Sequence, residues 1–276
     1  MKSSFIKKFA GKTAVITGSG REKGLGQAIA IKLASEGANI VVSDIGRSRD
    51  KATEDIHIGS SDAMEAVAAG LRDYGVNVTT CVADVRVQAD MKALALHAIK
   101  EHSSLDIWVN NAGIGYIMSP ILDVTEDDWR AVIDVNLTVC FWGFQVAAKT
   151  MMEQKTGGRI INIASQAAKS GFPFAQAYCA SKHGLVGLAR SASIELGPEK
   201  ITVNNVCPNH VTTELGDWQN KFTSKALGLT EEEYLQKMSD KIPLRRVGMP
   251  EDTGNAVAFL CSEEASYITG ESLNVS

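Results

Sequence analysis

Tyr178 and Lys182 lie four residues apart in a segment that we predict to be a helix running to about Leu196. Residues at this spacing stack on one helix face, so a phenol lies beside an ammonium group. The cation favours the phenolate and lowers the pKa of the phenol from its reference value of about 10, as acid/base chemistry near neutral pH requires. A buried tyrosine beside a solvent-reaching lysine is the structural alternative for such a pair.

Ser165 brings a hydroxyl group to the same region. It ends an apolar run, residues 159–164, that predicts a buried strand. In open α/β sheets, ligands bind beyond the carboxyl ends of the strands. We therefore expect the Ser165 hydroxyl and the Tyr178 phenol to meet the same ligand, with the helix after residue 175 carrying the phenol.

A nucleotide site is predicted near the start of the chain. The apolar run 13–17 is followed by a loop with glycines at positions 18, 20, 24 and 26, and then by a helical pattern over 27–34. Glycines permit a tight turn and close backbone approach, and a helix N-terminus presents free N–H groups to a pyrophosphate. Because the strand and the helix flank the glycines, the sequence predicts a dinucleotide site.

Asp44 bears on which dinucleotide binds. It ends a second predicted strand, 39–44, where its carboxylate can accept hydrogen bonds from both adenosine ribose hydroxyls and would repel a 2′-phosphate. This favours NAD over NADP. Arg47 and Arg49 follow closely and could hold a phosphate, although a surface loop explains them more simply.

The segments that follow continue the alternation of strands and helices. Residues 45–63 are polar and predict a long loop beside the adenosine site, in which His57 has no partner at metal-ligand spacing. Strand 76–82 precedes Asp84, which can meet the adenine amino group or cap the next helix. Strand 107–110 runs into small residues that let a flat ligand approach the backbone.

Asn136 is an unusual residue for the interior of a helix, which begins here at a capping box after Thr125. Its side chain can bond within the protein, or the helix can open locally and hold a water molecule. Residues 209–248 interrupt the alternation and predict an insert that covers a ligand. Pro250 suits the first position of a last helix, and residues 272–275 can close the sheet.

The regular alternation predicts a doubly wound, Rossmann-like α/β fold with a mainly parallel sheet and helices on both faces, as one domain over residues 1–276. The net charge of -4 gives no electrostatic case for nucleic acid or an anionic membrane. We expect no membrane-length apolar segment, no metal site, and a cytoplasmic location, since five scattered cysteines suit a reducing compartment.

Together these motifs resemble the short-chain dehydrogenase/reductase family over residues 11–275. The resemblance rests on the glycine loop, Asn110-Asn111-Ala112-Gly113, Asn136, Pro208 and the separation of 13 residues between Ser165 and Tyr178. It implies a seven-stranded sheet, an NAD cofactor, and homotetramers or homodimers built through the long helices. The residues then assigned to the cofactor are Gly18, Gly20, Gly24, Leu25, Gly26, Asp44, Ile45, Asp84, Val85, Asn111, Ala112, Gly113, Tyr178, Lys182, Pro208, Val211 and Thr213.

Three features depart from the family pattern. Five residues, rather than the usual three, separate Gly18 from Gly24; Asn209 replaces the usual glycine after Pro208; and Ser276 stands without the usual Asp-Gly-Gly ending. A longer glycine loop is also similar to that of enoyl-thioester reductases. Those enzymes place six residues between Tyr and Lys and lack the serine, so enoyl reduction is disfavoured.

The catalytic residues implied are Asn136, Ser165, Tyr178 and Lys182, which would interconvert a secondary alcohol and a ketone. Substrate contacts are expected from Ser165, Gln166, Tyr178, His210 and Trp218, with Tyr116, Phe172 and Phe174 as further candidates for the wall. A polyol, an acyloin or another small hydroxy compound would suit such a pocket. An NADP-dependent carbonyl reductase, a nucleotide sensor without activity and, more remotely, a purely structural oligomer are the alternatives.

Overall fold

A computed structural model describes all residues except 1–6, 49–57, 116–117, 214–219, 222 and 226. Seven parallel strands form one sheet in the order β3-β2-β1-β4-β5-β6-β7. The strands are β1 (Thr13–Thr17), β2 (Asn39–Asp44), β3 (Val78–Val82), β4 (Ile107–Asn110), β5 (Gly158–Ile163), β6 (Ile201–Pro208) and β7 (Ser272–Val275). The order reverses between β1 and β4, so the predicted doubly wound fold is confirmed.

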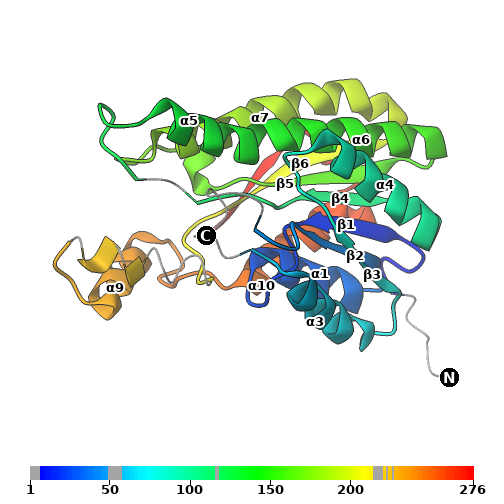
Figure 1. The fold of residues 1–276 in the computed structure, drawn as a ribbon, viewed down its shortest axis with the longest axis horizontal. Coiled ribbons are helices and arrows are strands. Elements are labelled where there is room, and N and C mark those ends of the chain that lie inside the picture. Colours follow the sequence, from blue (N-terminus) through cyan, green and yellow to red (C-terminus); the bar gives the residue numbers. More distant parts are fainter. Residues whose placement is uncertain (1–6, 49–57, 116–117, 214–219, 222, 226) are drawn as a thin grey trace.

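Helices cover both faces of this sheet (Figure 1). The helices are α1 (Leu25–Ser35), α3 (Ser61–Arg72), α4 (Gln88–His102), α5 (Glu126–Ile133), α6 (Val139–Gln154), α7 (Gln176–Leu196), α9 (Glu231–Lys241) and α10 (Pro250–Cys261). Successive residues of β1 explain the layering, because Ala14 and Ile16 pack with α1, α3 and α10, whereas Val15 packs with α4, α6 and α7.

Several predicted boundaries hold, including β4, β7, the end of α7 and the start of α10 at Pro250. The fifth strand ends earlier than predicted, because β5 spans Gly158–Ile163 and Ser165 begins a short 3-10 turn. The Ser165 Oγ accepts a hydrogen bond from the Ala167 N–H at 3.1 Å. The loop predicted over 45–63 ends earlier than expected, since Ser60 caps α3.

The helix containing Asn136 is interrupted, as one of the two sequence interpretations expects. Residues Asp134–Thr138 form a π-helical turn between α5 and α6. Such turns widen the helix and leave some backbone groups outside the regular ladder. The buried Asn136 side chain bonds to another segment, with Oδ1 accepting from the Ile114 N–H at 3.0 Å and Nδ2 donating to the Ile114 carbonyl at 3.1 Å.

The expectation that no segment approaches the length of a membrane span is wrong. Residues Glu126–Gln154 form one helical stretch of 29 residues that is long and apolar enough to cross a membrane. Its buried residues include Phe144, Ala147 and Met151, which pack against the sheet. Core helices of globular proteins pass the same test, so the stretch is weak support for a membrane span.

A row of polar side chains crosses the interior of the sheet. Asn110, Asn162 and Asn205 stand in register on β4, β5 and β6. Asn110 donates to Asn162 at 2.9 Å, and Asn162 donates to Asn205 at 2.8 Å. At the two ends, the Trp108 indole donates to Asn110 at 2.7 Å, and Asn205 donates to the Ser272 hydroxyl at 2.9 Å. This asparagine ladder satisfies buried amides and fixes the alignment of four strands.

Gly143 of α6 leaves the space that the ladder occupies. A Cβ at this position would collide with the Asn110 Oδ1 and lie 2.9 Å from the Trp108 Nε1. We expect Gly143→Ala to lower the free energy of unfolding by about 1–3 kcal/mol, as overpacking does. Gly187 is the matched control, because it lies in helix α7 with no atom within 4 Å of the added methyl group.

Gly187→Ala should raise the free energy of unfolding by up to about 1 kcal/mol, because alanine is the better helix former. Urea denaturation of both variants measures the difference. Equal stability of the Gly143 and Gly187 variants would contradict the close contact between α6 and the asparagine ladder.

Candidate functional site

The glycine loop between β1 and α1 is packed too closely for side chains at two positions. Gly18 has a φ of +65°, and a Cβ there would lie 2.8 Å from the Ala112 Cα. A Cβ at Gly26 would lie 2.5 Å from the Gly18 carbonyl oxygen and 2.7 Å from the Asn111 Nδ2. The loop therefore brings its backbone against β4, and Gly24 leads directly into the N-terminus of α1. This geometry suits a pyrophosphate.

Side chains from the ends of β1 and β4 hold the loop in place. The Asn111 Nδ2 donates to the carbonyls of Thr17 and Gly18 at 2.8 and 2.9 Å. The Thr17 hydroxyl oxygen accepts from the N–H groups of Asn111 and Ala112 at 3.1 and 3.0 Å. Asn111 therefore links the ends of β1 and β4 by hydrogen bonds at the point where the strand order reverses.

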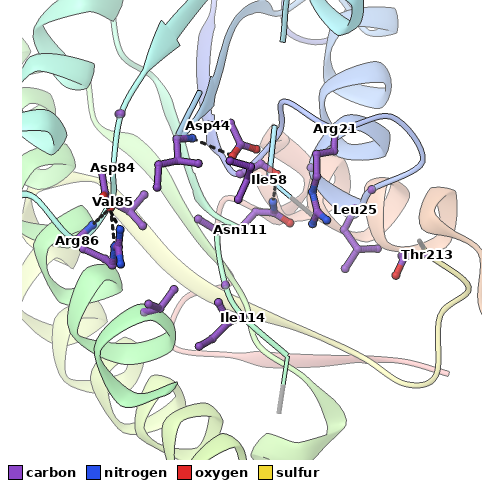
Figure 2. Close-up of a pocket in the computed structure, with 18 of the residues that line it drawn as sticks. Arg21, Leu25, Asp44, Ile58, Asp84, Val85, Arg86, Asn111, Ile114 and Thr213 are labelled. Atoms are coloured by element: carbon purple, nitrogen blue, oxygen red, sulfur yellow. Dashed lines mark hydrogen bonds and ion pairs between the residues drawn. The ribbon is translucent and has the colours of Figure 1, made fainter. Parts of the chain in front are cut away.

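A cavity of about 360 Å³ lies against this loop, and Figure 2 shows Asp44, Asp84 and Asn111 around it. We call it the cofactor cavity. Its lining includes most of the residues assigned to the cofactor: Gly18, Gly24, Leu25, Gly26, Asp44, Ile45, Asp84, Val85, Asn111, Ala112, Gly113 and Thr213. The glycine cradle at one side and a carboxylate at the end of β2 fit a dinucleotide.

Asp44 is held by backbone N–H groups. Its Oδ1 accepts from Ile45 and Gly59 at 2.9 and 3.1 Å, and its Oδ2 accepts from Gly20 at 3.1 Å. Burial raises the pKa of Asp44, while these three N–H groups and the charge of Arg21 oppose the rise. Since each carboxylate oxygen can accept two hydrogen bonds, Oδ2 keeps one acceptor position for a ribose hydroxyl.

Asp84 does not cap the helix that follows it, so that interpretation is wrong. The N-cap of α4 is Val87, and the Asp90 carboxylate accepts the Asp84 N–H at 3.0 Å. The Asp84 carboxylate instead pairs with Arg86, whose Nε and Nη2 donate to Oδ1 and Oδ2 at 3.0 and 2.8 Å. Asp84 and Arg86 both line the cofactor cavity, where the pair is drawn in Figure 2.

A second cavity of about 540 Å³ adjoins the first, because Leu25 and Thr213 line both. We call it the substrate cavity. Ser165 and Tyr178 line it together, as the sequence predicts. Its wall also includes four more of the substrate-contact candidates, Gln166, Phe172, Phe174 and His210. Trp218 and Tyr116 lie outside the described residues.

Lys182 lies beneath Tyr178. Its Nζ is 5.5 Å from the centroid of the Tyr178 ring and donates to the Ile163 carbonyl at 2.9 Å. The lysine is buried, whereas Tyr178 is half-buried and reaches the substrate cavity. A fixed cation beneath the phenol stabilises negative charge on the phenol oxygen.

Five of the residues that the sequence assigns to the cofactor do not line the cofactor cavity. Pro208 and Val211 line the substrate cavity, as Tyr178 does. Gly20 packs under Asp44, where a Cβ would lie 2.8 Å from the Asp44 Cβ. Lys182 is absent from the described lining of both cavities, because its ammonium group is buried against β5.

Sequence reasoning missed several lining residues. Arg21 and Arg86 line the cofactor cavity, and their charge beside a glycine loop and a strand end was the available signal. Tyr234, Met238 and Lys241 of α9 line the substrate cavity. Their spacing of four and three residues places them on one helix face. This spacing is visible in the sequence of the insert. Among the described residues, no three His, Cys, Asp or Glu side chains are grouped to hold a metal ion.

Comparisons with known proteins agree over nearly the whole chain. A family model described as Enoyl-(Acyl carrier protein) reductase matches residues 18–276. An uncharacterized oxidoreductase of Mycobacterium tuberculosis is 38% identical over 269 residues, which cover 96% of this chain and 94% of the relative. The L-2,3-butanediol dehydrogenase of Corynebacterium glutamicum is 35% identical over 260 residues, covering 94% and 95% of the two chains.

A solved structure gives the same picture. The crystal structure of carveol dehydrogenase from Mycobacterium avium in complex with NAD superposes with a TM-score of 0.89 at 30% identity. The match covers 98% of this chain and 97% of that one. A nicotinamide cofactor is therefore the ligand whose binding to the glycine loop should be tested.

Substitutions at two glycines of the loop distinguish the effect of packing within the protein from the effect of contact with the ligand. Gly24 lines the cofactor cavity, and the nearest atom to an added Cβ is the Arg21 carbonyl oxygen at 3.6 Å. We expect Gly24→Ala to keep the stability of the ligand-free protein and to weaken NADH binding about tenfold or more, because its methyl group faces the ligand.

Gly26→Ala should lower both stability and NADH affinity, because its methyl group collides with the loop itself. Thermal melting and NADH fluorescence titration measure the two properties. Unchanged NADH affinity in the Gly24 variant would show that the cofactor does not lie against this loop.

Proposed function

The chain belongs to the short-chain dehydrogenase/reductase family, and we propose that it interconverts a secondary alcohol and a ketone with NAD as cofactor. One observation carries the proposal. Tyr178 and Ser165 line a cavity that adjoins the cofactor cavity, and the Lys182 ammonium group lies beneath Tyr178.

The glycine loop and Asp44 would hold a nicotinamide cofactor, which would supply hydride transfer to or from the substrate carbon. Tyr178 takes the hydroxyl proton in oxidation and returns it to the oxygen in reduction. Lys182 stabilises the phenolate, since one of its N–H groups is fixed on the Ile163 carbonyl and its charge stays under the ring. The Ser165 hydroxyl donates a hydrogen bond to the same substrate oxygen and polarises it.

Asn136 has a different place in this scheme. Its side-chain amide is committed to the backbone of Ile114, so the side chain is a structural link between the π-helical turn and the strand end. We assign the role of holding a water molecule to the backbone of the π-helical turn, where the helix is widened. That water would carry the proton between Lys182 and solvent.

Asp44 supports NAD over NADP. Its carboxylate stands at the end of β2 in the cofactor cavity, with one acceptor position open to a ribose hydroxyl. A 2′-phosphate would meet this negative charge. Arg21 lines the same cavity and is the observation that favours the alternative, an NADP-dependent carbonyl reductase, because a guanidinium group can hold a phosphate.

The substrate cavity suits a hydroxy compound with an apolar part. Phe172, Leu227 and Met238 give it apolar walls, and Gln166 and His210 offer polar contacts. A diol or acyloin is compatible with the relative that acts on L-2,3-butanediol. We do not propose enoyl reduction, because three residues rather than six separate Tyr178 from Lys182.

Tyr178→Phe tests the proposal. Removing the phenol oxygen should lower kcat by roughly 100-fold or more, as the loss of an acid/base group does, and should leave NADH affinity within about threefold. Absorbance of NADH over a panel of secondary alcohols, repeated with NADP, measures turnover and cofactor preference. Tyr267→Phe is the matched control, because Tyr267 is fully exposed.

Near-normal turnover in the Tyr178 variant would refute its role as acid and base. Tight NADH binding by the unmodified protein without turnover of any compound would favour a nucleotide sensor. Faster reaction with NADP than with NAD would overturn the preference argued from Asp44.

A further inference from the structure

The lengthened glycine loop is attached to the rest of the protein on both sides of Arg21. Before it, the Gly20 N–H donates to the Asp44 Oδ2 at 3.1 Å. After it, the Lys23 N–H donates to the Gln27 Oε1 at 2.7 Å, and Lys23 adopts a left-handed conformation with a φ of +56°. The backbone that carries Arg21 is therefore held between the end of β2 and the first turn of α1.

The Arg21 side chain lines the cofactor cavity and is partly buried there. Within the described part of the chain, its guanidinium group makes no hydrogen bond and no ion pair. The other cation on the cavity lining, Arg86, is committed to the Asp84 carboxylate through Nε and Nη2. A guanidinium group has five N–H donors in a planar fork that matches the oxygens of carboxylates and phosphates. Arg21 therefore brings an unpaired positive charge to the ligand.

The position of Arg21 indicates which part of a dinucleotide it meets. Figure 2 shows its side chain pointing into the cavity between Asp44 and Leu25, the first residue of α1. The adenosine ribose is expected at Asp44, and the pyrophosphate is expected at the start of α1. The charge of Arg21 lowers the pKa of Asp44 less than any of the three N–H groups does, and the two described side chains form no ion pair. Arg21 is therefore not held by this carboxylate, and its place matches the pyrophosphate.

The charges around the cavity favour such a contact. Four carboxylates line it, Glu22, Asp44, Asp84 and Asp134, and among the described residues Asp84 is the one that has an ion pair. A pyrophosphate adds further negative charge. The N-terminus of α1 offers only about half a positive charge, although no acidic residue in its first turn opposes it. A guanidinium group beside the phosphates offsets the repulsion that the helix alone leaves.

Building on the proposed function, we infer that the Arg21 guanidinium group binds the pyrophosphate of the cofactor. The glycine loop then holds the phosphates by a charged side chain as well as by backbone N–H groups. Arg21 determines how tightly either nicotinamide cofactor binds, whereas the choice between NAD and NADP depends on Asp44. A contact between Arg21 and a 2′-phosphate is the competing assignment, and it predicts a different pattern of affinities.

Ligands that contain different parts of the cofactor test this inference. We would measure dissociation constants by fluorescence titration for NADH and NADPH, and by calorimetry for ADP and adenosine. Arg21→Met should weaken NADH, NADPH and ADP by a similar factor of about tenfold or more, the effect of one charge-assisted hydrogen bond, and should leave adenosine affinity unchanged. Arg21→Lys should recover part of the loss, because an ammonium group keeps the charge without the planar fork.

Lys23→Met is the matched control. It removes the same charge two positions along the loop, from a residue that is exposed and does not belong to the described lining of the cavity. All four affinities should stay as they are in the unmodified protein. Arg21→Met, in contrast, should also make NADH affinity less sensitive to added potassium chloride, because salt screens the ionic contact that this variant lacks.

A loss confined to NADPH would overturn the inference, since it would place Arg21 at the 2′-phosphate. Equal losses for adenosine and NADH would overturn it as well, because they reflect a damaged loop. Arg21-dependent binding of NADH and ADP without turnover of any alcohol or ketone would contradict the proposed function and support the contact. Turnover with NAD, together with unchanged NADH affinity in Arg21→Met, would overturn the contact and leave the proposed function standing.

Discussion

The hydrogen bond from the Lys182 Nζ to the Ile163 carbonyl fixes the centre of this protein. It attaches α7 to the last residue of β5 and prevents the buried ammonium group from moving toward solvent. Because Tyr178 is one helical turn before Lys182, the same bond determines where the phenol stands. Ser165 follows Ile163 by two residues, so a single short bond aligns the phenol, the cation and the hydroxyl with one strand end.

Hydrogen bonds between side chains inside the sheet fix the position of this strand end. The asparagine ladder joins β4, β5, β6 and β7 through Asn110, Asn162 and Asn205. On the other side, Asn111 joins β4 to the end of β1 and to the glycine loop. Leu25 and Thr213 line both the cofactor cavity and the substrate cavity, so the two cavities adjoin. The geometry of the site therefore depends on side-chain amides that connect neighbouring strands.

Local sequence patterns were sufficient to predict most helices and strands and the pairing of Tyr178 with Lys182. A spacing of four on a helix is enough to place Tyr178 over Lys182, and proline chemistry is enough to start α10 at Pro250. The asparagine ladder could not be predicted in the same way, because its members come together only when the strand order and register are known. The pairing of Asp84 with Arg86 was missed for a similar reason, since both partners had plausible roles on their own.

The most direct test of the central claim is the rate of NADH formation by Lys182→Met at saturating NAD, in a single turnover with a secondary alcohol that the unmodified protein oxidises. Removing the cation from beneath Tyr178 should lower this rate by about 100-fold or more, because the phenolate loses its stabilising charge. The folded structure should persist, since methionine fills the same buried space. A rate close to that of the unmodified protein would contradict the account.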